Sequence, residues 1–353
     1  MLKKSVKLKE SATYEEQIAV LRKRGCIIED ENLCQEILSQ ISYYRLSAYF
    51  LTYKTIDDKY ASDTNFNSIY QIYEFDRKLR HLLLLVLEEI EIFLRAQFSY
   101  YYTQKYGPDG YMNATNYNKK HNHFEFTSRI KSIIKENSKL PFVKHHIEHY
   151  GGKFPLWVIT ELFTFGMLSY FYADMLIADQ KKIANTVFRT PLPKNIRSWL
   201  RCCTILRNVC AHSGRLYNTI FSAIPADIPN IDQYQERRLF MIIMAVREIY
   251  PDINKWNDEF VPEISALFEE YKDIIQLKHI GFPANWEKTL MNLSATKTFF
   301  CTRTYNTAHQ SPGYNNHRRH NPRSRCACGK TRQSRTKRCC YALQSRPRRR
   351  GRV

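Results

Sequence analysis

Residues 82–98, with the sequence LLLLVLEEIEIFLRAQF, decide the fold class. At about 100° per residue, the apolar side chains of this stretch cover most of the circumference of a helix. A helix that is apolar nearly all round is buried against other elements. No proline occurs before Pro108, so a long helix is permitted. We therefore predict a long, buried helix over residues 66–105.

Helical periodicity recurs along the chain, whereas alternating β-branched runs and Asn-Gly hairpins are absent. We expect further helices over residues 13–24, 30–41, 123–137, 156–176, 194–213, 234–248 and 257–275. Glycine and proline clusters mark the loops between them. The predicted fold class is all-α, with an N-terminal helical cap over residues 1–65 and a main helical domain over residues 66–294.

A polar stripe crosses the long helix at helical spacing and consists of Arg77, His81, Glu88, Glu91 and Arg95. Buried charges must be paired, because desolvating an isolated charge costs several kcal/mol. Glu91 and Arg95, four residues apart, form the natural pair. Two interpretations remain open at this point. The stripe is either a salt bridge between helices, or it faces the helix of residues 194–213 and orients polar side chains there.

The formal net charge of +20 is distributed unevenly. Residues 295–353 contain 16 Lys and Arg and no acidic residue, which leaves 38 Lys and Arg against 34 Asp and Glu in residues 1–294. The body is therefore only mildly basic. The total charge gives no argument that the body binds nucleic acid.

Residues 295–353 have few aliphatic side chains, cannot bury a core and are expected to form a disordered basic tail. Cysteines at 326, 328, 339 and 340, with histidines nearby, raise the possibility of zinc, but their spacing matches no common C-x2-C ligand pattern. RNA binding by the tail is a second possibility. Translation past a natural end in another reading frame would also produce this abrupt change of composition, and we favour that explanation.

The cysteines of the body lie in helical patterns and are predicted to be buried hydrophobic residues in a reducing compartment: Cys26, Cys34, Cys202, Cys203 and Cys210. The N-terminal segment MLKKSVKLKESATY has no apolar signal region. The apolar run at residues 82–87 is far shorter than the ~20 residues that a membrane span needs. We expect a cytoplasmic protein without a membrane partner.

A second informative helix is predicted to begin after Pro191-Leu192-Pro193, because proline is favoured in the first turn. Its apolar stripe consists of Trp199, Cys203, Leu206 and Cys210. The opposite face is predicted to present Arg201, Asn208, His212 and Arg215. Arg207 lies between the two faces, about 140° from His212 on an ideal helix. An arginine and a histidine together can cleave RNA without a metal, although a basic face of this kind is more often only a solvated surface.

The segment RNVCAH, residues 207–212, followed by RLYN at 215–218, resembles the R-x4-6-H motif of HEPN-type ribonucleases. More closely, it resembles the Abi-like (AbiD/AbiF) abortive-infection proteins of bacteria. Three further blocks resemble the same family in the expected order, at residues 43–49, 75–95 and 155–169. The resemblance covers roughly residues 10–280.

This resemblance implies a HEPN-like helical bundle and a metal-independent endoribonuclease that acts in phage defence. His212 would be the general acid or base, Arg207 would hold the phosphate, and Asn208 would orient the phosphate or the ring. The resemblance and the polar faces add the substrate-binding or supporting residues Arg215, Glu91, Arg95 and Arg201. We expect no cofactor and no metal.

The expected partner is RNA, as substrate and as a small noncoding RNA that holds some Abi-like members inactive. The chain contains one such motif, so a symmetric homodimer would complete a site that needs both an acid and a base. Two alternatives stay open: a module that binds RNA without cleaving it, and a helical scaffold that binds only proteins.

Overall fold

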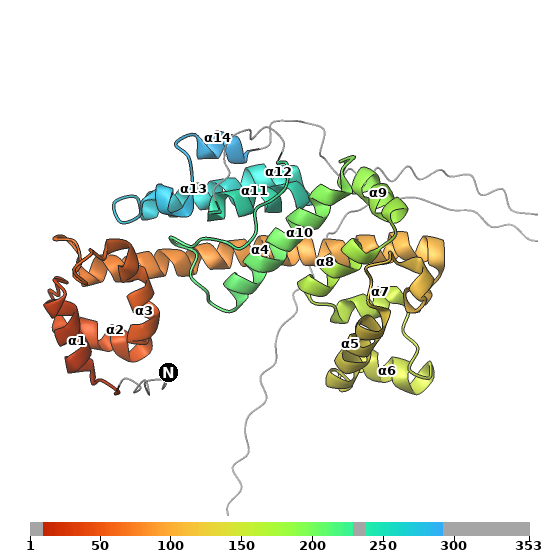
Figure 1. Cartoon of the computed structure of the whole chain (residues 1–353), viewed down its shortest axis with the longest axis horizontal. Coiled ribbons are helices and arrows are strands. Elements are labelled where there is room, and N and C mark those ends of the chain that lie inside the picture. The colour runs from red at the N-terminus through yellow and green to blue at the C-terminus, as the bar shows by residue number, and fades with distance from the viewer. Residues whose placement is uncertain (1–9, 229–236, 292–353) are drawn as a thin grey trace, which may run out of the picture. The chain divides into compact units, whose positions relative to one another are not determined.

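The computed structural model describes residues 10–228 and 237–291, and helix α4, Phe66–Tyr106, is the longest element among them (Figure 1). These residues form helices and a few isolated β-bridges, without a strand, which confirms the all-α class. The predicted tail at residues 295–353 lies outside the described residues. The division that we predict at residue 65 falls at the N-cap of α4 and stays a prediction.

Helix α4 forms where the sequence predicts it. The Asn65 side chain caps its first turn by accepting hydrogen bonds from the amides of Asn67 and Ser68, and the helix ends at Gly107, whose φ of 77° favours glycine. The prediction that it is buried all round is wrong. Leu85 and Ile92 are 58% and 57% exposed. Helices α3, α7, α8, α10 and α13 contact α4 and leave this one face open.

The N-terminal region contains α1, Tyr14–Lys23, α2, Glu31–Gln40, and α3, Tyr43–Phe50. Helix α1 begins with a reciprocal capping box between Thr13 and Glu16. Helix α3, which the sequence analysis did not predict, packs on α4. It carries the first of the blocks that resemble the Abi-like family.

Helix α10, Pro193–Ala211, begins with proline in its first turn, as predicted. It packs on α4, on α8, Phe165–Asp174, and on α11, Leu239–Ile249 (Figure 1). The predicted apolar stripe is buried in these contacts: Trp199, Cys203, Leu206 and Cys210.

Several boundaries differ from the sequence-based prediction. The helix predicted over 156–176 is divided into α7, Leu156–Ile159, a short 3₁₀ turn and α8, because Thr164 caps a new helix with its side chain. The helix predicted from residue 257 begins with a π-turn, Trp256–Phe260, and continues as α13, Val261–Glu270.

The remaining helices are α5, His123–Glu136, and α6, Pro141–His149, followed by α9, Ile177–Thr186, α12, Ile253–Lys255, and α14, Trp286–Leu290. Among these, α6, α9, α12 and α14 were not predicted. They are short, so the tertiary contacts that stabilise them outweigh any periodic signal.

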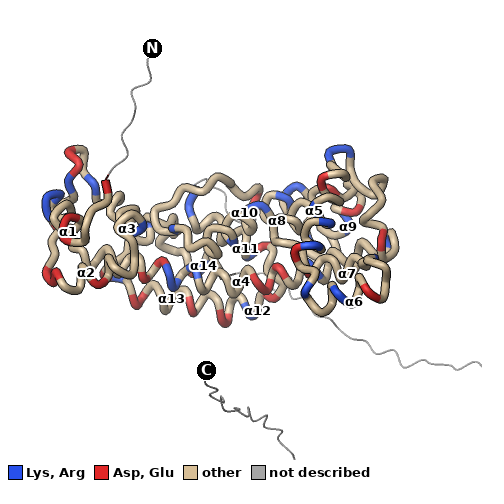
Figure 2. Tube along the Cα trace, turned by 90° about the horizontal axis from the view of Figure 1, so that it is seen from below, with Lys and Arg blue, Asp and Glu red and all other residues tan. Residues whose placement is uncertain are grey.

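The five cysteines of the body are buried and unpaired with one another, as predicted. Burial raises the pKa of Cys34 to about 11 and that of Cys210 to about 12, so both thiols stay protonated near neutral pH. Basic and acidic residues are interspersed along the described chain (Figure 2). None of the helices in residues 10–228 and 237–291 has the length and apolarity to cross a membrane.

Candidate functional site

Glu91 of α4 connects the long helix to Arg207 of α10. Its Oε1 accepts a hydrogen bond from Nη2 of Arg95 at 2.6 Å, and its Oε2 lies 3.7 Å from Nε of Arg207. The side chains of Glu91, Arg95 and Arg207 are 12%, 20% and 32% exposed. The stripe therefore faces α10 and forms a salt bridge between the two helices, and its role in orienting Arg207 for chemistry stays a prediction.

These three side chains line an open pocket of about 410 Å³. The other lining residues are Leu84, Leu85, Glu88, Ile92 and Ala211. Arg95 is fixed further because its Nη2 donates to the Phe163 carbonyl at 3.0 Å. A guanidinium held on one edge by a carboxylate keeps its other N–H groups available, so Arg207 can donate to an anion in this pocket. We call it the Arg207 pocket.

His212 lies one residue beyond the last residue of α10, as its C-cap, where its backbone N–H donates to the Asn208 carbonyl at 3.0 Å. Its side chain is exposed and has no hydrogen bond or ion pair with another described residue. His212 does not line the Arg207 pocket, whereas Asn208 accepts a hydrogen bond from Nη1 of Arg207 at 3.5 Å. The structure thus brings Arg207 and Asn208 together and leaves the His212 ring in solvent.

Helix α10 ends two residues earlier than predicted because the chain reverses at Ser213, whose φ is 54°. The Gly214 amide donates to the Val209 carbonyl at 2.7 Å. A Cβ at Gly214 would lie 3.0 Å from that carbonyl oxygen, so only glycine fits without a shift. Arg215 therefore lies outside the helix.

The predicted position of Arg215, on the same helix face as His212, is wrong. Its Nη1 donates to the Ala48 carbonyl of α3, and its guanidinium lies 5.9 Å from the centre of the Tyr49 ring. These contacts hold the segment after α10 against α3. They direct the Arg215 guanidinium to α3, and within the described residues it forms no hydrogen bond with Asn208 or His212.

Asp76 of α4 is a buried anchor for this same segment, and the sequence analysis did not select it. Its carboxylate accepts hydrogen bonds from the Tyr217 amide at 2.8 Å and the Leu216 amide at 3.0 Å. The Tyr49 hydroxyl and Nη1 of Arg80 each donate to Oδ2 at 2.7 Å. The side chains of Asp76 and Arg80 are 0% and 4% exposed.

Burial raises the pKa of the Asp76 carboxyl above its usual value. The Arg80 guanidinium and the bonded amides favour the charged form and so oppose this rise. Arg80 also donates to the Gly214 carbonyl at 3.2 Å, and Arg45 of α3 donates to the Ser213 carbonyl at 2.6 Å. The loop from Ser213 to Tyr217 is therefore fixed from two helices. The spacing of Asp76 and Arg80, four residues apart in a family-like block, is the sequence signal that could have indicated this pair.

Arg201 does not contribute to the Arg207 pocket. It is exposed on another face of α10 and lines a second pocket, described below. The predicted site residues therefore fall into three groups. Glu91 and Arg95 lie at Arg207, whereas Arg215 forms a structural contact with α3. Arg201 and His212 are exposed and lie away from the Arg207 pocket.

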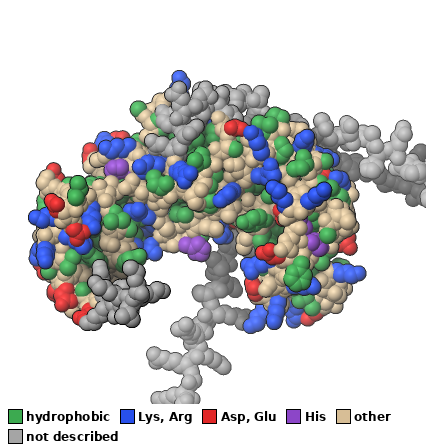
Figure 3. All heavy atoms as spheres, viewed as in Figure 1, with side chains coloured by type: hydrophobic (Ala, Val, Ile, Leu, Met, Phe, Trp, Pro, Cys, Tyr) green, Lys and Arg blue, Asp and Glu red, His purple; other side chains and the backbone are tan. Residues whose placement is uncertain are grey.

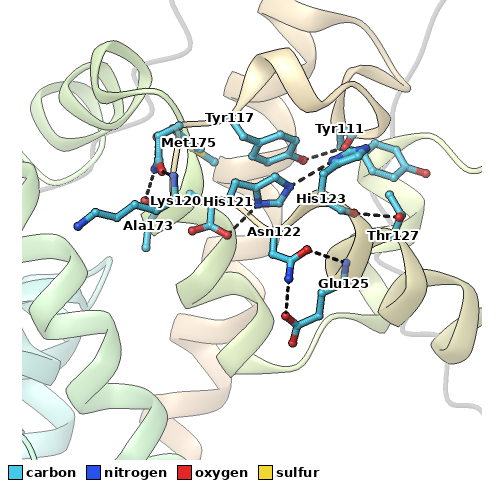
Figure 4. Close-up of polar contacts among 12 residues, drawn as sticks. Tyr111, Tyr117, Lys120, His121, Asn122, His123, Glu125, Thr127, Ala173 and Met175 are labelled. Carbon is cyan, nitrogen blue, oxygen red and sulfur yellow. Dashed lines mark hydrogen bonds and ion pairs between the residues drawn. The ribbon is translucent and has the colours of Figure 1, made fainter.

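A second polar network, also unpredicted, lies near the start of α5 (Figure 4). Nδ1 of His121 lies 2.9 Å from the Asp174 carboxylate, Nε2 of His121 lies 3.2 Å from Nδ1 of His123, and Nε2 of His123 lies 2.9 Å from the Met112 carbonyl. The network joins the start of α5 to the end of α8. Across the described ranges, no group of three or more His, Cys, Asp or Glu residues is placed to hold a metal ion.

The fold and this site define a class: an all-α protein in which one buried aspartate holds the loop after an arginine- and histidine-bearing helix. The family model described as Abi-like protein matches residues 36–218, and the chain belongs to this family. The matched residues include the block of α3, the anchor at Asp76 and the whole of α10. Neither a search of curated proteins nor a search of solved structures returned a match.

Membership of the Abi-like family supports a role in abortive infection, a bacterial defence against phage. It confirms the Abi-like resemblance, over a shorter range than the residues 10–280 expected. The relation to HEPN-type ribonucleases stays a prediction.

Proposed function

We propose that the protein is a metal-independent endoribonuclease that acts in abortive infection. One observation carries this proposal: Glu91 holds Arg207 at the wall of an open pocket, five residues before His212, whose ring is exposed. A fixed cation and an unengaged imidazole, once a bound RNA brings both to one phosphate, are the groups that RNA self-cleavage chemistry needs.

In the proposed reaction, the 2′-hydroxyl of RNA attacks the adjacent phosphorus and the bond to the 5′-oxygen of the next nucleotide breaks. The 2′-hydroxyl loses its proton to a base and the leaving 5′-oxygen gains one from an acid. The products are a 2′,3′-cyclic phosphate and a 5′-hydroxyl. Arg207 would stabilise the charge on the phosphate, with Asn208 beside it, and His212 would transfer one of the protons.

A second copy of the chain would supply the other proton-transfer group. One His212 cannot easily be base and acid in the same step, so a symmetric dimer that brings two motifs together completes the site. An exposed stripe of α4 beside the Arg207 pocket supports this part of the proposal. Leu85 and Ile92, both more than half exposed, flank the pocket and would be covered in such a dimer.

The test is cleavage of RNA by the purified full-length chain, its His212→Ala variant and its Arg207→Ala variant. We expect each substitution to reduce cleavage by about 10²- to 10⁴-fold. His149→Ala, at an exposed histidine of α6, is the matched control and should cleave as the wild type does. Cleavage should persist in EDTA and leave cyclic phosphate ends. Products with 3′-hydroxyl ends, or a folded His212→Ala protein with full activity, would refute the mechanism.

The alternative is a module that binds RNA without cleaving it. The observation that favours it is the position of His212, whose ring has no described partner to fix its tautomer and does not line the Arg207 pocket. In that case, RNA would copurify with the protein, its ends would be unaltered, and His212→Ala would bind RNA as the wild type does. A small noncoding RNA recovered in this way would be a candidate inhibitor.

A further inference from the structure

A second pocket, of about 580 Å³, lies between α8 and α10 and shares no lining residue with the Arg207 pocket. Arg197 and Arg201 of α10 line it, together with the hydroxyl-bearing Ser169, Thr204 and Ser222. None of its lining residues is acidic. The pocket therefore offers cations and neutral hydrogen-bonding groups. We call it the Arg197–Arg201 pocket.

The two guanidinium groups are available to a ligand. Arg197 and Arg201 are both exposed, and within the part of the chain that the structure describes neither has an ion-pair or hydrogen-bond partner. They lie four residues apart, so they are neighbours on one helix face. Figure 3 shows Lys and Arg side chains on the face that α8 and α10 present in this view. Unpaired, adjacent arginines are suited to phosphate oxygens, which guanidinium groups bind in a bidentate manner.

An aromatic side chain completes the pocket. Tyr170 of α8 lines the pocket and is 74% exposed. Most of its large ring is therefore open to a ligand. A flat, exposed ring beside two cations fits a ligand that has phosphates and planar bases. Single-stranded nucleic acid has both, because its phosphates bind cations while its bases stack on aromatic rings.

The pocket also lies in line with the predicted catalytic residues. Arg197, Arg201, Thr204 and Asn208 recur on one face of α10 at intervals of four, three and four residues. From Arg201 to the end of the helix at His212 the rise is roughly 16 Å. A strand of a few nucleotides spans this length, so RNA that lies along α10 would reach both places.

We propose that the Arg197–Arg201 pocket is a subsite for single-stranded RNA, in which the two arginines bind successive phosphates and Tyr170 stacks on a base. The subsite rests on the proposed ribonuclease function for its ligand and adds to it the position of the strand. It binds nucleotides that lie a few positions along the strand from the scissile phosphate. It therefore affects the affinity for longer RNA and does not change the rate of the chemical step.

The test measures binding of a labelled single-stranded oligoribonucleotide by full-length protein that carries His212→Ala, so that no cleavage intervenes. The double variant Arg197→Ala/Arg201→Ala should bind more weakly and should lower the slope of log affinity against log salt by about 1.4, at about 0.7 per phosphate contact. Tyr170→Ala should weaken binding by about 5- to 150-fold, the range for one base on an aromatic ring, and Tyr170→Phe should restore most of it.

The matched control is Lys131→Ala/Lys135→Ala on α5, which removes two exposed charges with the same spacing. It should leave affinity and salt slope close to those of the parent protein. Equal losses in the two double variants would show that only overall charge matters, and would overturn the subsite. Unchanged affinity in Arg197→Ala/Arg201→Ala would overturn it as well.

A second arm separates this inference from the ribonuclease proposal. With His212 intact, Arg197→Ala/Arg201→Ala should raise KM for a long RNA and leave cleavage of a dinucleotide unchanged. If the wild type cleaves nothing but the binding results hold, the subsite stands and the ribonuclease proposal fails. If cleavage is normal for every substrate in the double variant, the subsite fails and the ribonuclease proposal stands.

Discussion

The two ends of the segment from Arg207 to Tyr217 use their polar groups in opposite ways. From Ser213 onward, backbone and side chains are bonded to α3 and α4 through Arg45, Asp76 and Arg80. At Arg207 and His212, the side chains are partly or fully exposed, and among residues 10–228 and 237–291 only Glu91 and Asn208 form polar contacts with the guanidinium.

The contrast separates residues that hold the segment from residues that are available to a ligand. A polar group that is already bonded and buried contributes to a defined conformation, because leaving it unpaired would be costly. An exposed polar group on a fixed backbone keeps its hydration, so its free energy of hydration is lost only when a ligand binds. The anchored loop therefore fixes the end of α10 and with it the direction in which Arg207 and His212 are presented.

Asp76→Ala should have the largest effect on stability. It leaves Arg80 buried without its counter-charge and the amides of Leu216 and Tyr217 without an acceptor, at a cost of about 3–5 kcal/mol. Urea unfolding followed by circular dichroism measures it. Glu270→Ala, which removes an exposed carboxylate paired with Lys78 at the other side of α4, should change the midpoint little. If both variants unfold at the same urea concentration, Asp76 is not an anchor.

Much of the fold was predictable, because hydrophobic periodicity is a local property. The bounds of α4 and the pairing of Glu91 with Arg95 both follow from spacing within one helix. The role of Asp76 as an anchor was not predictable in this way, since the Leu216 amide that it binds lies 140 residues further along the chain. Arg215 was misplaced for a related reason: the reversal at Ser213 and Gly214 removes it from the helix face that an ideal helix would give it.

Glu91→Ala should have the next largest effect on stability, and it tests the exposed end of the segment, at Arg207. Arg95 would lose its partner in a largely buried position, which costs about 1–3 kcal/mol. Glu91→Gln keeps the shape and one acceptor for Arg95 and should be more stable than Glu91→Ala. If Glu91 also positions Arg207, both variants should lower kcat for RNA cleavage with KM little changed. Equal melting temperatures for the two variants would show that the Arg95 contact contributes nothing.

Arg215→Ala should have a smaller effect, on stability rather than on chemistry. It removes the hydrogen bond to the Ala48 carbonyl and the contact with the Tyr49 ring, together worth about 1–2 kcal/mol. Thermal unfolding and kcat are measured on the same preparation, with Arg129→Ala, at an exposed position of α5, as the control. A normal melting temperature with lost cleavage would place Arg215 among the catalytic residues and would break the division drawn here.

The smallest expected effect is a dependence of stability on pH at the far end of the anchored loop. The Gln276 amide donates to the Tyr217 hydroxyl at 3.0 Å, and that hydroxyl lies 2.8 Å from Nδ1 of His279. Burial, with Lys278 and Arg238 nearby, lowers the pKa of His279 below its usual value.

The unfolded chain then takes up the proton of residue 279 at a higher pH than the folded chain does. The free energy of unfolding should therefore be fully retained above the ordinary histidine pKa of about 6.5, decline as the pH falls below it, and level off below the folded pKa. His279→Gln cannot titrate, so the difference between its urea midpoint and that of the wild type should change across this range. A difference that is constant with pH would show that His279 binds its proton equally in both states. The Tyr217 contact would then be no part of what holds the loop after α10.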